Sequence, residues 1–189
     1  MRKLVAVELV SLDGVMESPE EWAFPYTDDE MNEANATGMA ASDALLIGRK
    51  TYEGMVAFWP NQPDGTPMVD YINSVRKFVV STTLDDNLEW NNSVLIGGGE
   101  GNVAEEIVEL KRQPGKGITV LGSGVLVRSL LREGLLDELT LMVHPVVLGS
   151  GKRLFDDDGE RRSLELVDAT AFGSGVVSLV YRPLAGQDL

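Results

Sequence analysis

The sequence contains no cysteine and a single histidine, His144. The absence of cysteine excludes disulfide bonds, thiolate metal sites and a cysteine nucleophile, and it favours a reducing compartment. We therefore expect a cytoplasmic protein. A lone histidine inside an apolar strand, just before Pro145, is more typical of a structural residue than of a metal site or a catalytic triad. We predict no bound metal.

Basic residues are scarce as well. The 189 residues include 16 Lys and Arg against 30 Asp and Glu, which gives a formal net charge of -14. A field of this sign repels phosphate backbones and disfavours nucleic-acid partners. It also repels any phosphate-bearing small molecule. Such a ligand therefore needs a local group of cations and backbone N–H donors.

Long hydrophobic runs are also missing. No stretch approaches the roughly 20 apolar residues that cross a bilayer, so we expect no membrane association. The apolar start of the chain is broken by Glu8, Ser11 and Asp13, which favours a first strand over a signal peptide. With 43% hydrophobic and 24% charged residues, the chain has the size and composition of a single domain, residues 1–189.

Strands and helices alternate over most of the sequence. Apolar, β-branched segments predict strands at residues 4–10, 44–47, 77–80, 94–96 and 118–121. Capping residues and periodicity predict helices at residues 27–41, 52–58, 68–75, 103–112 and 125–132, with a long loop at 15–27. Strands without intervening helices are predicted at 139–148, 164–172 and 176–181. This order indicates an α/β fold with a mostly parallel central sheet, flanked by helices, and an antiparallel C-terminal edge.

A glycine turn with two cations follows the second predicted strand and opens a helix. Its residues are Gly48, Arg49, Lys50 and Thr51. A parallel strand that turns through glycine into a helix presents backbone N–H groups and the positive end of the helix dipole, which favours phosphate. Arg49 adds a bidentate donor and Lys50 a point charge. A solvated Arg-Lys pair at a helix start explains the same residues equally well.

A second glycine turn carries no charge. It consists of Gly122, Ser123, Gly124 and Val125. Taken alone, this turn is explained more simply as a tight connection that needs glycine for its dihedral angles. Two such turns, together with Ser81 and Thr82 at the end of another strand, favour a ligand with several phosphates, such as a dinucleotide.

Three further motifs carry less weight. Residues 99–104 match the G-x-G-x-x-A dinucleotide pattern, but no Asp or Glu lies between Glu109 and Glu133 to hold a ribose, and Glu100 would crowd a pyrophosphate. We therefore reject a standard Rossmann site. Residues 149–152 resemble a phosphate loop without a following helix, and we predict a hairpin or edge turn. The three carboxylates of residues 156–158 are interpreted as solvated.

Three stretches carry a resemblance to a known family. They are residues 45–52 (LLIGRKTY), residues 120–124 (VLGSG) and residues 130–155, which include GLLDEL and PVVLGSG. With these motifs the chain resembles the dihydrofolate reductase-like superfamily, and in particular the reductase domain of the bifunctional riboflavin-biosynthesis deaminase-reductase. The likeness covers nearly the whole chain, without the zinc-binding deaminase half.

The resemblance implies a reductase with NADPH lying across the ends of the parallel strands. The family segment that meets the cofactor phosphates matches Arg49, Lys50 and Thr51, and the strand end near the adenosine 2′-phosphate matches Ser81 and Thr82. The segment under the pyrophosphate matches Gly122, Ser123, Gly124 and Val125. The flexible loop over the nicotinamide matches Leu12, Asp13 and Gly14. Relatives of the riboflavin type also imply a homodimer, with the apolar C-terminal strands as its interface.

The sequence departs from the family on the substrate side. Dihydrofolate reductases place a carboxylate soon after a Trp and a Pro, where it helps to protonate the pterin. Asp28 and Asp29 follow Trp22 and Pro25 at a longer spacing, so they are candidate catalytic residues, although helix capping explains them equally well. The riboflavin-pathway reductase needs no such acid.

We therefore expect an NADPH-dependent reductase of a small heterocyclic substrate, similar to 5-amino-6-(5-phosphoribosylamino)uracil reductase. The predicted substrate-binding residues are Asp13, Trp22, Tyr52 and Met55. Two alternatives stay open. One is a dihydrofolate reductase, which requires Asp28 or Asp29 in the pocket. The other is a non-catalytic NADP-binding protein that has kept the phosphate turns.

Overall fold

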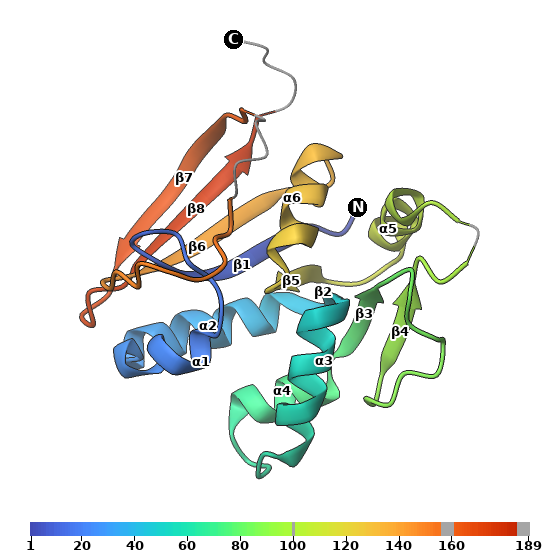
Figure 1. Ribbon diagram of the computed structural model, residues 1–189, viewed down its shortest axis with the longest axis horizontal. Coiled ribbons are helices and arrows are strands. Elements are labelled where there is room, and N and C mark those ends of the chain that lie inside the picture. Colours follow the sequence, from blue (N-terminus) through green and yellow to red (C-terminus); the bar gives the residue numbers. More distant parts are fainter. Residues whose placement is uncertain (100, 156–160, 185–189) are drawn as a thin grey trace.

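A computed structural model describes residues 1–99, 101–155 and 161–184. They form one eight-stranded sheet with the order β4-β3-β2-β5-β1-β6-β8-β7 (Figure 1). Its strands are β1 (Leu4–Ser11), β2 (Ser42–Gly48), β3 (Arg76–Val80), β4 (Ser93–Ile96), β5 (Gly117–Leu121), β6 (Glu138–His144), β7 (Leu164–Ala171) and β8 (Val177–Pro183). The first six strands are parallel, and β8 pairs antiparallel with both β6 and β7. The predicted mostly parallel sheet with an antiparallel C-terminal edge is confirmed.

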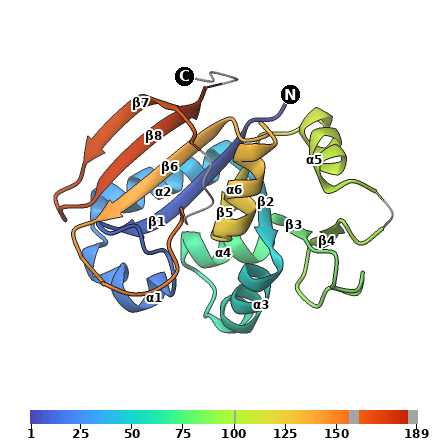
Figure 2. The same ribbon diagram turned by 45° about the horizontal axis from the view of Figure 1, so that its top comes forward.

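Helices cover both faces of this sheet. The main helices are α2 (Asp29–Ala41), α3 (Arg49–Phe58), α4 (Pro67–Ser74), α5 (Val103–Arg112) and α6 (Gly124–Arg132). Figure 2 shows α6 in front of the sheet and α2 behind it. Because the six parallel strands run in one direction, their carboxyl ends meet at a single edge, where α3, α5 and α6 begin. Helix N-termini and strand ends together make this edge the natural ligand-binding side of the fold.

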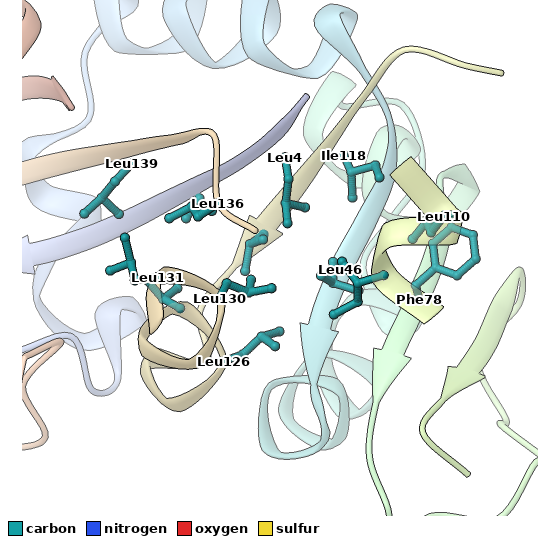
Figure 3. Close-up of a cluster of buried hydrophobic side chains, with 14 of the residues drawn as sticks. Leu4, Leu46, Phe78, Leu110, Ile118, Leu126, Leu130, Leu131, Leu136 and Leu139 are labelled. Atoms are coloured by element: carbon teal, nitrogen blue, oxygen red, sulfur yellow. The ribbon is translucent and has the colours of Figure 1, made fainter. Parts of the chain in front are cut away.

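The larger hydrophobic core lies between the sheet and the helices α5 and α6 (Figure 3). In α6 the buried residues Leu126, Val127, Leu130 and Leu131 recur at helical spacing, so they form one apolar stripe. This stripe packs on alternate residues of the central strands, including Leu4 and Ile118, which are fully buried. Truncating one such leucine to alanine costs about 2–5 kcal/mol, so the stripe holds the start of α6 firmly at the strand ends.

Two connections differ from the sequence-based prediction. The loop at 15–27 contains two short helical segments, α1 (Pro19–Trp22) and a 3-10 turn (Phe24–Tyr26), which are too short to show a periodic pattern. The strand predicted to reach residue 148 ends at His144, because Pro145 has no N–H to continue a ladder. A third short helical turn, Trp59–Asn61, follows α3.

Residues 149–152 do not form a hairpin, because β6 pairs with β8 and not with the next strand, β7. This segment instead lies beside the loop that follows β1. The N–H of Met16 donates to the carbonyl of Lys152 at 2.9 Å, and the N–H of Leu154 donates to that of Gly14 at 3.0 Å. The segment therefore braces the β1 loop at the carboxyl edge.

Residue Glu100 and the carboxylates at 156–158 lie outside the described residues. Within the described ranges, no helix is long and apolar enough to cross a bilayer. The same ranges contain no group of three or more His, Cys, Asp or Glu side chains arranged to hold a metal ion.

Candidate functional site

A cavity of about 1760 Å³ runs along the carboxyl edge of the sheet. Its wall includes residues of β1 and β2, the glycine turns before α3 and α6, the first residues of α5, and the segment of α1 and α2. Cavities for a single drug-sized ligand measure about 300–1,000 Å³. The volume therefore leaves room for a dinucleotide and a second small molecule.

The turn at residues 48–51 lies on the cavity wall. Gly48 ends β2 and is the N-cap residue of α3, so Arg49, Lys50 and Thr51 form the first turn of that helix. Backbone N–H groups of a first helical turn point beyond the helix and carry its positive dipole end. Arg49 is about half exposed, and its guanidinium lies 3.9 Å from the Glu53 carboxylate one turn later.

The turn at residues 122–125 also lies on the wall, and its backbone explains its glycine. Gly122 and Ser123 both have left-handed dihedral angles, with φ of 58° and 63°. A Cβ on Gly122 would approach the Thr51 side chain to 3.1 Å, so this position is restricted both by its φ and by its neighbour. The two consecutive left-handed residues direct the chain from β5 abruptly into α6.

The Ser123 hydroxyl joins the two turns. Its Oγ accepts a hydrogen bond from the N–H of Gly48 at 2.8 Å and lies 2.5 Å from the Thr51 Oγ1. These two contacts hold the N-termini of α3 and α6 side by side, facing the same cavity. Among the described residues, neither N-terminus has a side-chain hydrogen bond from its own N-cap residue, so its backbone N–H groups are not used by a cap.

Five cations line this cavity: Arg49, Lys50, Arg128, Lys152 and Arg153. Some of them also brace the walls. Arg128 donates to the carbonyl of Leu154 at 2.7 Å, and Arg153 donates to that of Asp13 at 2.9 Å. The same wall carries the carboxylates of Glu17, Glu20 and Glu133, and Lys152 pairs with Glu17 at 3.1 Å, so the cavity has a modest local excess of positive groups in a chain at -14.

Ser81 and Thr82 follow β3 but do not belong to the cavity wall, which includes Val80 just before them. Ser81 is buried, and its Oγ accepts hydrogen bonds from the N–H groups of Thr83 and Leu84, both at 3.1 Å. Thr82 is exposed. Ser81 therefore shapes the turn after β3, and Thr82 is the residue of this pair that solvent reaches.

Asp13 holds a neighbouring loop. Its carboxylate accepts hydrogen bonds from the N–H groups of Leu148 and Gly149 at 3.1 and 2.9 Å, and from the Ser11 hydroxyl at 2.7 Å. These hydrogen bonds, with that of Ser11 the strongest, lower the pKa of Asp13 to about 2. Asp13 is not on the cavity wall, and Leu12 beside it is exposed.

Of the other predicted substrate residues, only Met55 lies on the cavity wall. Trp22 is buried behind it, where its ring stands edge-on to His144 with centroids 5.2 Å apart. Tyr52 is buried too, and its hydroxyl accepts a hydrogen bond from the N–H of Trp90 at 3.1 Å. Both rings support the wall from behind.

The two candidate catalytic aspartates lie at the start of α2, outside the cavity wall. Asp28 is the N-cap of that helix, accepting hydrogen bonds from the N–H groups of Met31 and Ser174, both at 2.8 Å. The backbone donor of Met31 contributes most to the lowered pKa of Asp28. Asp29 is exposed in the first turn. This geometry matches the helix-capping explanation of Asp28.

Sequence reasoning missed several residues of the wall. His144 lies there, fully buried, with its Nδ1 2.8 Å from the Met142 carbonyl, and burial lowers its pKa. Asn102 caps α5 on the same wall, within the segment whose glycine pattern we rejected as a Rossmann site. Glu8 is a third such residue, and its sequence signal is a charged side chain in phase with the apolar residues of β1.

Known proteins resemble this chain over nearly its whole length. The family model described as "RibD C-terminal domain" matches residues 2–178. The uncharacterized protein YyaP of Bacillus subtilis (strain 168) is 33% identical over 186 residues, which cover 95% of this chain and 94% of that protein.

Two solved structures share the fold. One is a protein of Shewanella sp. PV-4 named for riboflavin biosynthesis, with a TM-score of 0.74, 20% identity, and coverage of 96% of this chain and 99% of that chain. The other is dihydrofolate reductase of Enterococcus faecalis, with a TM-score of 0.61, 16% identity and coverage of 96% of both chains. The predicted dihydrofolate reductase-like fold is confirmed.

Proposed function

Because the chain belongs to the RibD C-terminal domain family, we propose that it is an NADPH-dependent reductase of a small heterocyclic substrate, of the riboflavin-pathway type. The observation that carries the proposal is the pair of helix N-termini joined by the Ser123 hydroxyl, facing a cavity lined by five cations. This arrangement suits a dinucleotide with several phosphates.

The residues of the two turns suit different parts of such a cofactor. Arg49, Lys50 and Thr51 would hold phosphate groups by charge and backbone N–H donors, and residues 122–125 would accept the pyrophosphate close to their backbone. Ser81 and Thr82 stay candidates for the adenosine 2′-phosphate. Bound NADPH supplies the hydride, and the protein positions it against the substrate and excludes water.

The substrate would occupy the part of the cavity between α3 and the α1–α2 segment. The wall there is largely apolar and includes Met55 and Phe58 of α3 with Phe24 and Met31 opposite. Such a wall suits a flat heterocycle. Asp13, Trp22 and Tyr52 would not touch this substrate. Asp13 would hold the neighbouring loop in place, and the rings of Trp22 and Tyr52 would support the cavity wall from behind.

The first experiment is a titration with NADPH and with NADH, followed by nicotinamide fluorescence, on the wild type and on Arg49→Ala. Losing a charge-assisted contact should weaken NADPH binding by roughly 10- to 100-fold; an equal loss with NADH would assign Arg49 to a phosphate that both cofactors carry, and a loss with NADPH alone would assign it to the 2′-phosphate. Arg132→Ala is the matched control, because Arg132 lies on the last turn of α6, outside the cavity wall. Absence of binding by both cofactors would contradict the proposal.

The two alternatives make distinct predictions. A dihydrofolate reductase would lose turnover when Asp28 or Asp29 is replaced by Asn, whereas we expect no such loss, because Asp28 caps α2 and neither aspartate is on the cavity wall. A non-catalytic NADP-binding protein would show no thermal stabilisation of its NADP-loaded form by any pterin or pyrimidine nucleotide. Stabilisation by a pyrimidine nucleotide would favour the riboflavin-type reductase.

We further propose that the protein is a cytoplasmic homodimer. The edge strand β7 leaves Leu166 and Val167 exposed by 53% and 45%, and an apolar edge of this kind favours pairing with a second chain. Light scattering should give the mass of a dimer for the wild type and of a monomer for Leu166→Lys. A monomeric wild type would contradict this assembly.

A further inference from the structure

Glu8 is a carboxylic acid buried in the middle of an apolar strand. Along β1, Leu4, Ala6 and Val10 point into the core beneath α6, and Glu8 shares their face of the sheet. Its side chain is only 2% exposed. An apolar residue at this position would extend the core without cost, whereas burying a carboxylate is expensive.

The carboxyl group of Glu8 is incompletely satisfied. Burial raises its pKa well above the usual value, and a hydrogen bond from the N–H of Gly122 opposes this only in part. Its Oε1 has no hydrogen-bond partner among the residues that the structure describes. Burial therefore favours the neutral form of Glu8, and its Oε1 retains an unused hydrogen-bonding capacity.

Lys77, on β3, is a buried charged residue whose hydrogen bonds are supplied by the protein itself. It is also fully buried, but its ammonium group donates to the carbonyls of Asn73, Val75 and Asn91 at 3.2, 2.9 and 3.2 Å. It also lies 4.4 Å from the centre of the Trp90 ring. The protein itself satisfies Lys77, whereas it leaves the Oε1 of Glu8 without a partner among the described residues.

The sheet opens beside Glu8. Pairing of β1 with β5 ends at Val7 and Leu121, whereas pairing of β1 with β6 continues to Ser11 and His144. The cavity enters this gap, and both Glu8 and Gly122 belong to its wall. The unsatisfied acid is thus placed next to the turn that carries the proposed pyrophosphate site.

We propose that Glu8 is a ligand-binding residue, whose neutral carboxylic acid forms paired hydrogen bonds with an amide-like group of the molecule held in the cavity. This inference rests on the proposed function. A neutral acid offers an O–H donor beside a C=O acceptor, which complements the N–H and C=O of an amide. Its neutrality also avoids repulsion of the phosphates nearby.

Two molecules of the proposed reaction carry an amide-like group that could pair with Glu8. One is the carboxamide of the nicotinamide ring, and the other is the lactam edge of a pyrimidine substrate.

Two variants separate a binding role from a structural one. Glu8→Gln keeps a donor and an acceptor, whereas Glu8→Leu keeps approximate size and loses both. Glu8→Leu removes an unpaired buried polar atom but also leaves the Gly122 N–H without its acceptor, so the melting temperature should change little while binding weakens about tenfold.

The first arm measures cofactor affinity by nicotinamide fluorescence. The 3-acetylpyridine analogue of NADPH has a ketone in place of the carboxamide, so it keeps the acceptor and lacks the N–H donor. If the carboxamide is the partner, the wild type binds NADPH more tightly than the analogue. In Glu8→Leu this difference should disappear, and Glu8→Gln should retain most of it.

The second arm measures thermal stabilisation by 5,6-diaminouracil. If a pyrimidine is the partner, Glu8→Leu binds NADPH like the wild type and loses the stabilisation that the uracil gives to the NADP-loaded protein. Infrared difference spectra of wild type against Glu8→Gln add a direct readout. They should show the C=O stretch of a protonated acid at neutral pH, and this band should shift when the partner binds.

Two results would overturn the inference. One is the absence of the protonated-acid band. The other is a Glu8→Leu variant that matches the wild type with NADPH and with 5,6-diaminouracil. A wild type that binds no NADPH contradicts the proposed function by itself, and the uracil arm, measured without cofactor, then decides the role of Glu8.

Discussion

The two glycine turns each bring the N-terminus of a helix to the cavity, but they do so by different means. The turn at Gly48 has ordinary dihedral angles and carries the cations, whereas the turn at Gly122 has left-handed angles and carries no charge. The Ser123 hydroxyl connects them. One turn therefore supplies charge and the other supplies backbone shape, and each property is open to a separate test.

The largest effect is expected at the turn that supplies shape. Gly122→Ala puts a Cβ into left-handed backbone and 3.1 Å from Thr51, so we expect a loss of about 2–3 kcal/mol in unfolding free energy and the loss of NADPH binding. Chemical denaturation and the fluorescence titration measure the two effects.

Gly134→Ala is the matched control for this change. Gly134 has φ of 64°, close to that of Gly122, but no atom lies within 4 Å of the place that a Cβ would take there, so only the backbone cost of about 1 kcal/mol applies. Its NADPH binding should be normal. Equal losses in the two variants would mean that contact with Thr51 does not matter.

The junction between the turns should have a smaller effect. Ser123→Ala and Thr51→Val each remove one hydroxyl of the same hydrogen-bonded pair, and each should cost about 1 kcal/mol. Because they break one shared contact, the double variant should cost less than the sum, by about 0.5–1 kcal/mol. Urea denaturation of all four proteins gives this coupling energy.

Ser74→Ala tests whether the coupling is specific. The Ser74 hydroxyl donates to the carbonyl of Asp70 at 2.6 Å, on α4 and outside the cavity wall. Combined with Thr51→Val, it should give additive losses. Additivity between Ser123→Ala and Thr51→Val as well would show that the two turns are stabilised independently.

Local patterns in the sequence were enough to predict both turns. Gly48 and Gly122 each follow an apolar strand and precede a helix, so the backbone signals and the edge of the sheet on which they lie were readable. The pairing of Ser123 with Thr51 was not readable, because it joins residues far apart in sequence through a tertiary contact. Asp13 is similar, since its partners are the N–H groups of residues 148 and 149.

Glu8 was within reach of sequence reasoning. It alternates in phase with Leu4, Ala6 and Val10 in a strand that is apolar on both faces, so a charged residue there predicts a buried carboxyl. The short helix α1 was not within reach, because four residues do not establish a period. The predicted strand at 139–148 extended beyond the observed end at His144, because the apolar residues after Pro145 resemble a strand.

The smallest effect is expected at the turn that supplies charge. Glu53 lies 3.9 Å from Arg49, and both side chains are about half exposed, so Glu53→Gln should change unfolding free energy by less than about 0.5 kcal/mol. Without this carboxylate the Arg49 guanidinium is more available to phosphate. NADPH affinity should therefore rise about two- to threefold at low salt, and the gain should vanish at high salt.

Glu109→Gln is the control for this last change. Glu109 also forms an exposed ion pair with an arginine on its own helix, at 3.5 Å from Arg112, but it is not on the cavity wall. It removes the same charge from the protein, so it corrects for the overall field of a chain at -14. If both variants gain NADPH affinity equally, the effect belongs to net charge, and the particular role of Arg49 in the charged turn is contradicted.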